Sequence, residues 1–372
     1  MADNKDKKVL NVPALRFPEF TGEWKSVHLE DVAEFQKKRI SSDLLNNNNY
    51  ISTENILQNF EGIQYSSSIP TNTNVIEYQK GDILLSNIRP YLKKVWFSDR
   101  KGGCSADVFV LRGDKCDQHF LYYVIASDRF INYVMSGVKG VKMPRGDKNQ
   151  MKKYAFSIPT NTEQRKIAKF LSMLDERIKL QNKIIEKLET LIKGIRNNIM
   201  SKIKGDCITL QDIADIYQPQ TIASTDLTED GYLVYGANGI IGKYHSFNHE
   251  KEQICITCRG NTCGTVNFTE PKSWITGNAM VINTDNYAKN VNKRYLFHYL
   301  SSINFNSIIS GSGQPQIVRQ PLAKLKLILP VLIIQNRIAE CLDAMFAKMK
   351  NEQSFLQILQ IQKSCLLSQM FI

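Results

Sequence analysis

Three cysteines have the side chains and the spacing with which a zinc site could begin. Cys255 and Cys258 form a Cys-x-x-Cys pair, Cys263 follows shortly after, and thiolates are favoured zinc ligands. A second pair at a suitable spacing is missing, and the equivalent positions of a related stretch earlier in the chain carry no cysteine. We therefore predict buried or neutral cysteines and no metal site, with a zinc site as the alternative.

The densest positive charge lies between residues 136 and 153. Asp147 is the only acid in this stretch, and glycines separate its basic residues. A flexible basic loop suits contact with phosphate groups, although an ordinary solvated loop can have the same composition. The DNA-binding candidates in this segment are Lys139, Lys142, Arg145 and Lys148.

Further candidates lie on predicted loops and strand ends, and those of the second half include a loop that is rich in amides. Arginine can pair bidentately with guanine, and asparagine or glutamine with adenine. For any one of these residues, ordinary surface charge is an equally good explanation. The candidates are Lys37, Lys38, Arg39, Arg89, Lys93 and Lys94 in the first half, and Asn238, Lys243, Arg259, Asn261, Thr262, Gln314, Gln316 and Arg319 in the second.

The chain lacks the motifs of the enzymes that act on DNA with a cofactor or a nucleotide. It has no Asn/Asp-Pro-Pro-aromatic segment of an amino-methyltransferase, no phosphate-binding loop of the Gly-x-x-x-x-Gly-Lys-Ser/Thr type and no Gly-x-Gly-x-x-Gly. The sequence therefore predicts a non-catalytic chain that has no catalytic residues and no cofactor of its own.

Composition favours a soluble protein with a polyanionic partner. Lysine and arginine number 48 against 36 acids, which gives a net charge of +12, and nucleic acid is the leading candidate partner. No apolar run is long enough to span a bilayer, the N-terminus is charged, and the eight cysteines are scattered. We expect a cytoplasmic protein.

The chain contains an internal repeat. Residues 83–97 align without a gap over residues 254–268, an offset of 171. Nearer the start, residues 29–33 match residues 210–214 at an offset of 181, so the second copy has lost about ten residues. A shared scaffold with different loops is expected when a framework is kept while its recognition surface varies. Pro159, Gln164, Ile167, Ala168 and Leu171 recur as Pro330, Gln335, Ile338, Ala339 and Leu342.

Each copy shows the same order of elements. A short helical segment is followed by strand-like runs at 78–85 and 253–257, by helical stretches at 120–134 and 294–300, and by closing strands at 154–159 and 325–330. This order predicts an α+β fold, with two tandem domains of mixed structure.

A long helix is expected after each copy. Thr160 and Glu163 form a capping box, and residues 163–200 have no proline, which predicts a helix of about 38 residues and roughly 57 Å. Its apolar residues follow a heptad seam that recurs 171 positions later, so we expect the two helices to pair as an antiparallel coiled coil with pseudo-two-fold symmetry. Gln181 and Glu352 would then lie close together. The seam positions are Ile167, Leu171, Leu174, Ile178, Gln181, Ile185, Leu188, Ile192, Ile195 and Ile199, and then Ile338, Leu342, Met345, Met349, Glu352, Leu356, Leu359, Lys363, Leu366 and Met370.

The order of these motifs resembles the specificity subunit of type I restriction-modification systems over nearly the whole chain. The similar segments are Pro13-Ala-Leu-Arg-Phe-Pro-Glu-Phe20, Trp24-Lys-Ser-Val-His-Leu29, Glu163-Gln-Arg-Lys-Ile-Ala168, Tyr235-Gly-Ala-Asn-Gly239 and Gln335-Asn-Arg-Ile-Ala339. The resemblance implies two target recognition domains that read the halves of a bipartite, asymmetric DNA target. The length of the predicted helix pair separately predicts half-sites about one helical turn apart. It also implies two modification (methyltransferase) subunits and restriction (translocase/nuclease) subunits as partners, which would hold S-adenosylmethionine, ATP and Mg²⁺. Ile334 stands where the family has a glutamate, so a contact through that position is not expected in the second copy.

The predicted domains follow from the repeat and the helices. Two other functions remain open: a stand-alone DNA-modifying enzyme with an unrecognised site, and a coiled-coil scaffold for protein interactions. The predicted boundaries are an N-terminal tail at 1–23, target recognition domain 1 at 24–160, spacer helix 1 at 161–200, a linker at 201–206, target recognition domain 2 at 207–330 and spacer helix 2 at 331–372.

Overall fold

The computed structural model describes residues 11–66, 68–138, 140, 142–237, 239–311 and 313–372. These residues form two compact units. Unit 1 comprises residues up to Gln181 together with Phe355–Ile372, and unit 2 comprises Asn182–Ser354. No helix in the described part of the chain is both long enough and apolar enough to cross a membrane. Each unit is built on the same plan.

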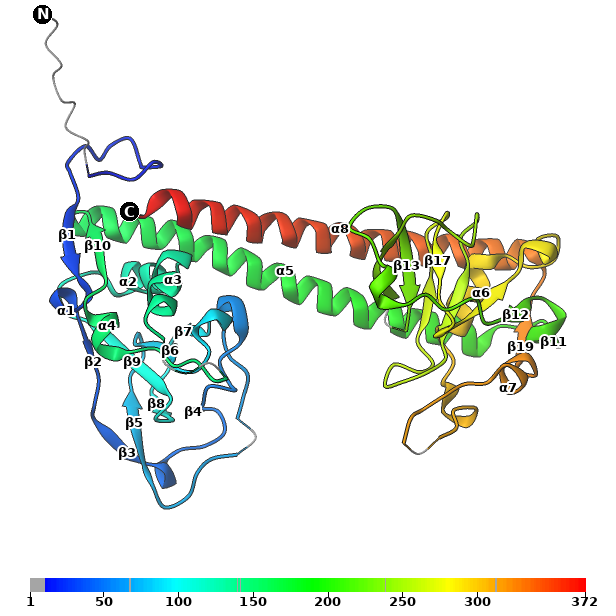
Figure 1. Ribbon diagram of the computed structural model, residues 1–372, viewed down its shortest axis with the longest axis horizontal. Coiled ribbons are helices and arrows are strands. Elements are labelled where there is room, and N and C mark those ends of the chain that lie inside the picture. Colours follow the sequence, from blue (N-terminus) through cyan, green and yellow to red (C-terminus); the bar gives the residue numbers. More distant parts are fainter. Residues whose placement is uncertain (1–10, 67, 139, 141, 238, 312) are drawn as a thin grey trace, which may run out of the picture. The chain divides into compact units, whose positions relative to one another are not determined.

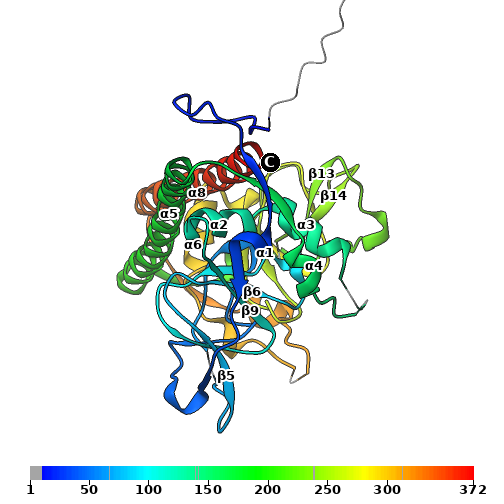
Figure 2. The same ribbon diagram turned by 90° about the vertical axis from the view of Figure 1, so that its left-hand side faces the viewer.

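The main sheet of unit 1 has the strand order β2-β9-β6-β7, and all of its pairings are antiparallel. Figure 2 shows β6 and β9 side by side. The two strands are mainly apolar, and β6 is buried throughout. The bounds are β2 Ala33–Phe35, β9 Val108–Gly113, β6 Ile83–Ser86 and β7 Val95–Phe97.

Two short helices cover this sheet. Asp117 caps the N-terminus of α2 (Gln118–Ile125) and Ser127 caps that of α3 (Asp128–Ser136), and each of these side chains accepts a hydrogen bond from a backbone N–H of the first helical turn. Where the sequence predicted one helical stretch, the cap at Ser127 divides it into two. The aromatic rings of Phe120 and Phe130 are fully buried in the core of the unit.

A second sheet of unit 1 has the order β3-β5-β8-β4. Residues 78–85, predicted as one strand-like run, are divided between β5 and β6 by a turn in which Gly81 has a φ of +91° and Asp82 accepts from the backbone N–H of Gln79. The bounds are β3 Arg39–Ser41, β4 Tyr50–Ile51, β5 Asn74–Tyr78 and β8 Gly102–Cys104, with 3₁₀ turns η1 Ser42–Leu44, η2 Gln58–Phe60 and η3 Pro90–Leu92.

Unit 2 repeats the main sheet in the order β12-β18-β15-β16. Strands β15 and β16 begin 171 positions after β6 and β7, as the internal repeat predicts. The bounds are β12 Asp215–Tyr217, β18 Ala279–Asn283, β15 Ile254–Thr257 and β16 Val266–Phe268, and helix α6 (Lys293–Leu300) takes the place of α2.

The second sheets of the two units differ, and this is the region in which the second copy is shorter. In unit 2 the order is β14-β13-β17, with one antiparallel and one parallel pairing. The bounds are β13 Tyr232–Gly236, β14 Gly239–Tyr244 and β17 Trp274–Ile275, with 3₁₀ turns η5 Ser224–Asp226, η6 Asp285–Tyr287 and η7 Phe305–Ser307.

A two-stranded ribbon closes each unit beside the start of a long helix. Strand β1 pairs with β10 in unit 1, where Figure 1 shows them adjacent, and β11 pairs with β19 in unit 2. The bounds are β1 Lys25–His28, α1 Leu29–Val32, α4 Lys148–Lys152 and β10 Ala155–Ile158 in unit 1, and β11 Asp206–Thr209, η4 Leu210–Asp212, α7 Arg319–Ala323 and β19 Lys326–Leu329 in unit 2.

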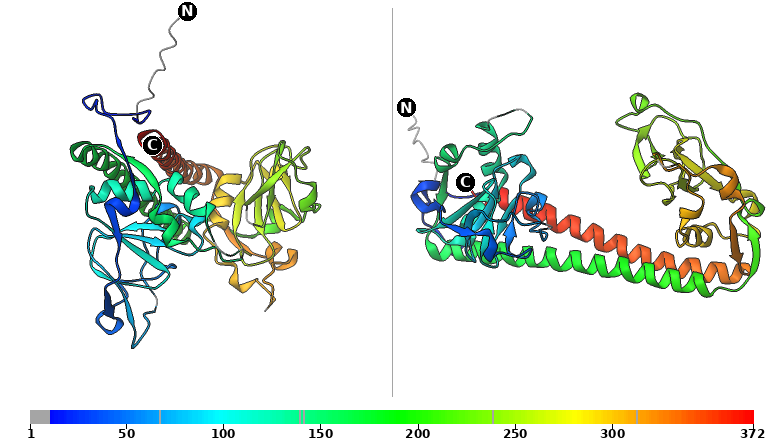
Figure 3. Two further views of the ribbon diagram at one scale, coloured as in Figure 1. Left: turned by 60° about the vertical axis from the view of Figure 1, so that its left-hand side comes forward. Right: turned by 90° about the horizontal axis from the view of Figure 1, so that it is seen from below.

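The two long helices are α5 (Asn161–Lys202) and α8 (Leu332–Met370), and each contributes to both units. In unit 1 the beginning of α5 packs with the end of α8, since Ile167 and Leu171 share a core with Leu367 and Met370, and Figure 3 shows these segments together. In unit 2 the end of α5 packs with the beginning of α8. Within each unit the helix segments are therefore antiparallel.

Every predicted seam position is buried or half-buried, including Gln181 and Glu352. Lys363, a charged residue in the seam of α8, forms an ion pair of 2.6 Å with Asp175 of α5 in unit 1. The pairing of the helices along their whole length, and the approach of Gln181 to Glu352, stay predictions.

Candidate nucleic-acid interface

Three loops of unit 1 meet at the end of β6. The backbone N–H of Asn87 donates to the carbonyl of Asp107 at 2.8 Å, Gly146 donates to Asn87 at 3.0 Å, and Arg89 donates to Pro144 at 2.8 Å. The first loop follows β6, the second precedes β9 and the third carries the basic segment. The fold thus brings the basic segment onto the end of the main sheet.

The same three hydrogen bonds recur in unit 2. Cys258 donates to Asn278 at 3.0 Å, Ile317 donates to Cys258 at 3.0 Å, and Gly260 donates to Pro315 at 3.0 Å. All five residues lie 171 positions after their counterparts in unit 1. We call the three loops held together in this way the loop junction of each unit.

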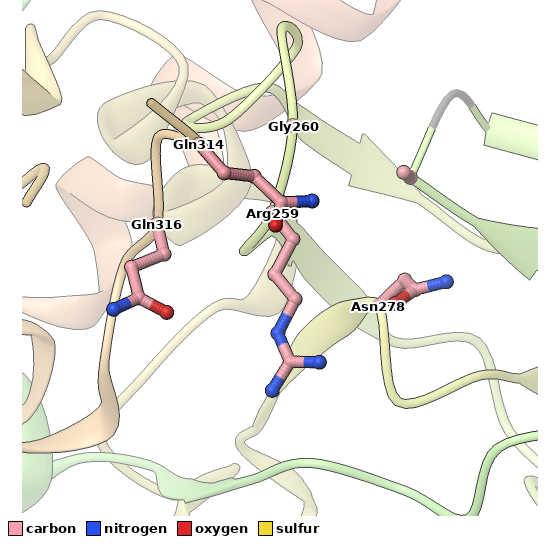
Figure 4. A pocket seen from close by; sticks show the side chains of 6 residues that line it. Arg259, Gly260, Asn278, Gln314 and Gln316 are labelled. Atoms are coloured by element: carbon pink, nitrogen blue, oxygen red, sulfur yellow. The ribbon is translucent and has the colours of Figure 1, made fainter. Parts of the chain in front are cut away.

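The loop junction of unit 2 surrounds an open cavity of about 390 Å³. Four of the lining residues have polar side chains: the guanidinium of Arg259 and the amides of Asn278, Gln314 and Gln316. Figure 4 shows them around one space. These groups can donate and accept hydrogen bonds at the edge of a base. The lining residues are Ala237, Arg259, Gly260, Asn278, Gln314 and Gln316.

The loop junction of unit 1 is more strongly charged. Arg145 forms an ion pair of 3.4 Å with Asp107, and its side chain stays 54% exposed. Arg89 is exposed and has a φ of +50°, a strained conformation for a residue with a side chain. Such strain is frequent at functional sites, and here it is held by the hydrogen bond to Pro144.

Lys148 begins α4 and packs against the main sheet of unit 1. Its ammonium lies 4.7 Å from the centroid of the Phe35 ring and 5.8 Å from that of Phe109, in cation–π geometry. Burial lowers its pKa, and the nearby positive charges of Lys37 and Lys152 lower it further. At this edge of the sheet, Lys37 and Lys152 therefore lie close enough to Lys148 for their charges to affect its pKa.

Several other candidates already have partners inside their own unit. Lys94 donates to the carbonyl of Thr53 at 2.7 Å, and burial lowers its pKa. Arg319 donates to the carbonyl of Ile216 at 2.7 Å, and Thr262 donates to that of Ala237 at 3.1 Å. The other such pairs are Lys38 with Glu77, Arg39 with the carbonyl of Asn74, Lys93 with Asp128, and Lys243 with Asp230.

Four other candidates are exposed, namely Lys37, Lys142, Asn261 and Gln314. Lys139 and Asn238 lie outside the described residues. Two residues of the loop junctions, Asp107 and Asn278, were not among the candidates. Their equivalence at the repeat offset was visible in the sequence, but only the fold shows that they face Arg145 and the cavity of unit 2.

The cysteines are built into the main sheet of unit 2. Cys255 and Cys258 are buried, and burial raises the pKa of the Cys255 thiol to about 12. Gln218 donates to the sulfur of Cys258 at 3.1 Å. Within the described ranges, no group of three or more histidines, cysteines or carboxylates is arranged to hold a metal ion.

Known proteins share this architecture. The profile of the type I restriction modification DNA specificity domain matches residues 21–190 and again 206–360. The specificity subunit of the type I restriction enzyme EcoprrI from Escherichia coli is 28% identical over 169 residues, which are 44% of this chain and 41% of that protein. The chain thus spans less than half the length of this curated relative.

Two solved structures share the fold at low sequence identity. The S subunit of a type I restriction-modification system from M. genitalium matches with a TM-score of 0.66 and 17% identity, over 97% of this chain and 99% of that one. A chain from a structure on complex assembly and conformational transition of the type I system matches with a TM-score of 0.57 and 18% identity, over 92% and 96%. The doubled profile match confirms the predicted resemblance and its tandem organisation, and the chain belongs to the family of type I restriction modification DNA specificity domains.

Proposed function

We propose that this chain is the DNA-specificity subunit of a type I restriction-modification complex and that it recognises a bipartite, asymmetric target. One observation carries the proposal: the two units repeat the three hydrogen bonds of the loop junction but surround them with different side chains. A constant frame with variable chemistry is what two readers of different half-sites require.

Each loop junction contacts one half of the target. In unit 1 the exposed cations Arg89, Lys142 and Arg145 supply phosphate and base contacts, with Lys37 and Lys148 beside them. In unit 2 the amides and Arg259 of the cavity supply hydrogen bonds with fewer charges. We expect DNA binding through unit 1 to depend more steeply on salt than binding through unit 2.

The chain is non-catalytic in this proposal, and the chemistry belongs to its partners. Two modification subunits provide adenine methylation with S-adenosylmethionine, and restriction subunits provide ATP- and Mg²⁺-dependent translocation and cleavage. The long helices α5 and α8 pair in antiparallel fashion and offer the platform on which the partners assemble. Because its target is DNA inside the cell, we place the complex in the cytoplasm.

The test is to co-express the chain with the modification subunit encoded beside it and to map adenine methylation across the host DNA by single-molecule sequencing. We expect methylation of a single bipartite motif that disappears when this chain is omitted. Methylation that is absent, or that persists unchanged without the chain, would contradict the proposal. A control that expresses the modification subunit alone shows how much methylation occurs without this chain.

A further inference from the structure

One part of the loop junction brings three residues of each unit together. In unit 1 a backbone bridge joins Ile88 to Arg145, and in unit 2 the equivalent bridge joins Arg259 to Gln316. The third residue precedes the central strand β9 or β18 and accepts the first hydrogen bond of the junction. We call this the shared position; it consists of Ile88, Asp107 and Arg145 in unit 1 and of Arg259, Asn278 and Gln316 in unit 2.

In unit 1 the shared position presents an oriented guanidinium. Arg145 is 54% exposed, and its ion pair with Asp107 restricts the directions that the side chain can take. Proline precedes Arg145, and the junction fixes the backbone on either side of it through Pro144 and Gly146. An arginine held in this way keeps further N–H donors for the two acceptors, O6 and N7, that guanine shows in the major groove.

In unit 2 the shared position presents the amide of Gln316 beside the guanidinium of Arg259. The backbone of Gln316 is fixed by two hydrogen bonds with Ser310, at 2.8 and 2.9 Å, while its side chain lines the cavity. The neutral Asn278 stands where unit 1 has Asp107, so this position carries no acid. A carboxamide has one acceptor and donors side by side, which match the N6 donor and N7 acceptor of adenine.

We propose that the shared position reads one base pair in each half of the target: Arg145, positioned by Asp107, reads a guanine, and Gln316 reads an adenine. The inference rests on the proposed function and names the side chains that set specificity at one place in each half-site. The same scaffold position thus changes its base preference through a change of side chain.

The test for unit 1 uses Arg145→Gln in the assembled complex of this chain and its modification subunit. Binding is measured against a DNA library in which each base pair of the wild-type motif is varied in turn. We expect discrimination at one guanine of one half-site to fall about 5- to 150-fold, while every other position keeps its preference. Asp107→Asn should weaken the same preference to a smaller extent.

The matched control is Lys115→Gln, which also removes one exposed positive charge but lies beyond the opposite end of β9. It should leave every base preference unchanged. An Arg145→Gln complex that binds all library members more weakly by the same factor would show a phosphate contact and would overturn the inference, as would an unchanged preference at every position.

Unit 2 gives an independent test with Gln316→Ala, measured against the same library. We expect relaxed preference at one adenine of the other half-site only. A change in the half-site that Arg145→Gln affects, or no change in preference, would overturn the assignment. Failure of the proposed function is distinguishable, because the wild-type complex would then show no motif before any variant is made.

Discussion

The side-chain oxygen of Gln164 accepts a hydrogen bond of 2.8 Å from the backbone N–H of Asp117, which joins the start of α5 to the start of α2. The amide nitrogen of Gln164 donates to the carbonyl of Pro159 at 2.9 Å, and the residue is buried. Gln335 makes the equivalent pair of bonds in unit 2, with Asn292 and Pro330. A buried amide therefore docks the long helix in both units.

We predict that Gln164→Leu lowers the free energy of unfolding by about 2 kcal/mol or more, because it removes the side-chain partner of one buried and one partly buried backbone group. Urea unfolding of the purified chain measures the change. Gln357→Leu, an exposed position on α8, is the control and should alter stability by less than about 0.5 kcal/mol. Equal stability of the two variants would contradict the docking role.

The carboxylate of Glu163 docks the N-terminal segment onto α5. Arg16 donates to it at 2.6 and 2.7 Å and the indole N–H of Trp24 at 3.3 Å, and Glu163 is only 1% exposed. Its carboxylate, assigned from the sequence to a capping box, thus serves a contact within this chain. In unit 2, Ile334 takes the equivalent place.

We predict that Glu163→Gln destabilises unit 1 by about 2 kcal/mol, because the charged partner of a partly buried arginine is lost. Trypsin should also cleave after Arg16 several-fold faster in the variant than in the wild type. Glu19→Gln removes the exposed ion pair with Lys166 and serves as the control, with little effect expected. Unaltered cleavage in Glu163→Gln would count against the docking of the segment.

Two buried histidines make the stability of unit 2 depend on pH. Burial lowers the pKa of His298, although Asp343 at 2.7 Å opposes this, and burial likewise lowers the pKa of His249. The folded state therefore disfavours their protonation relative to the unfolded chain, whose histidines titrate near 6.5. Their contribution to stability is complete above that value and is lost as the pH falls through the lower pKa of the folded state.

Thermal unfolding at pH 7.5 and 5.5 checks this expectation. The unfolding midpoint of the wild type should be lower at pH 5.5, and replacing both His298 and His249 by glutamine should reduce the difference. A wild-type midpoint that rises on acidification would refute the assignment.

Thiol reactivity separates structural cysteines from a metal site. Cys207, Cys341 and Cys365 are exposed, whereas burial raises the pKa of Cys104 and Cys255 to about 12. Because the thiolate is the reactive form, we predict that these three exposed cysteines of the native chain react with a disulfide reagent much faster than its buried thiols. A chelator should change neither the reaction nor the unfolding midpoint. Slow thiols that become fast on chelation would revive the zinc alternative.

The sequence by itself determined the tandem plan. The offset of 171 residues predicts where β6, β7 and β10 recur as β15, β16 and β19, because a repeated apolar frame must bury the same strands. The run of residues 163–200 without proline predicts α5, and its seam positions are all buried or half-buried, since the period of about 3.5 residues keeps them on one face. These helices and strands could be predicted because each depends on the spacing of apolar residues within its own segment of the chain.

Only the tertiary structure decided which candidates share a site. Lys94 and Lys142 were both candidates from the sequence, yet the ammonium of Lys94 binds the carbonyl of Thr53 while Lys142 is exposed. Arg145 and Asp107 are far apart in the chain, and the loop junction brings them within 3.4 Å. The physical reason is that charge and hydrogen-bonding capacity belong to the residue type, whereas the partner that satisfies them is set by the packing of distant loops.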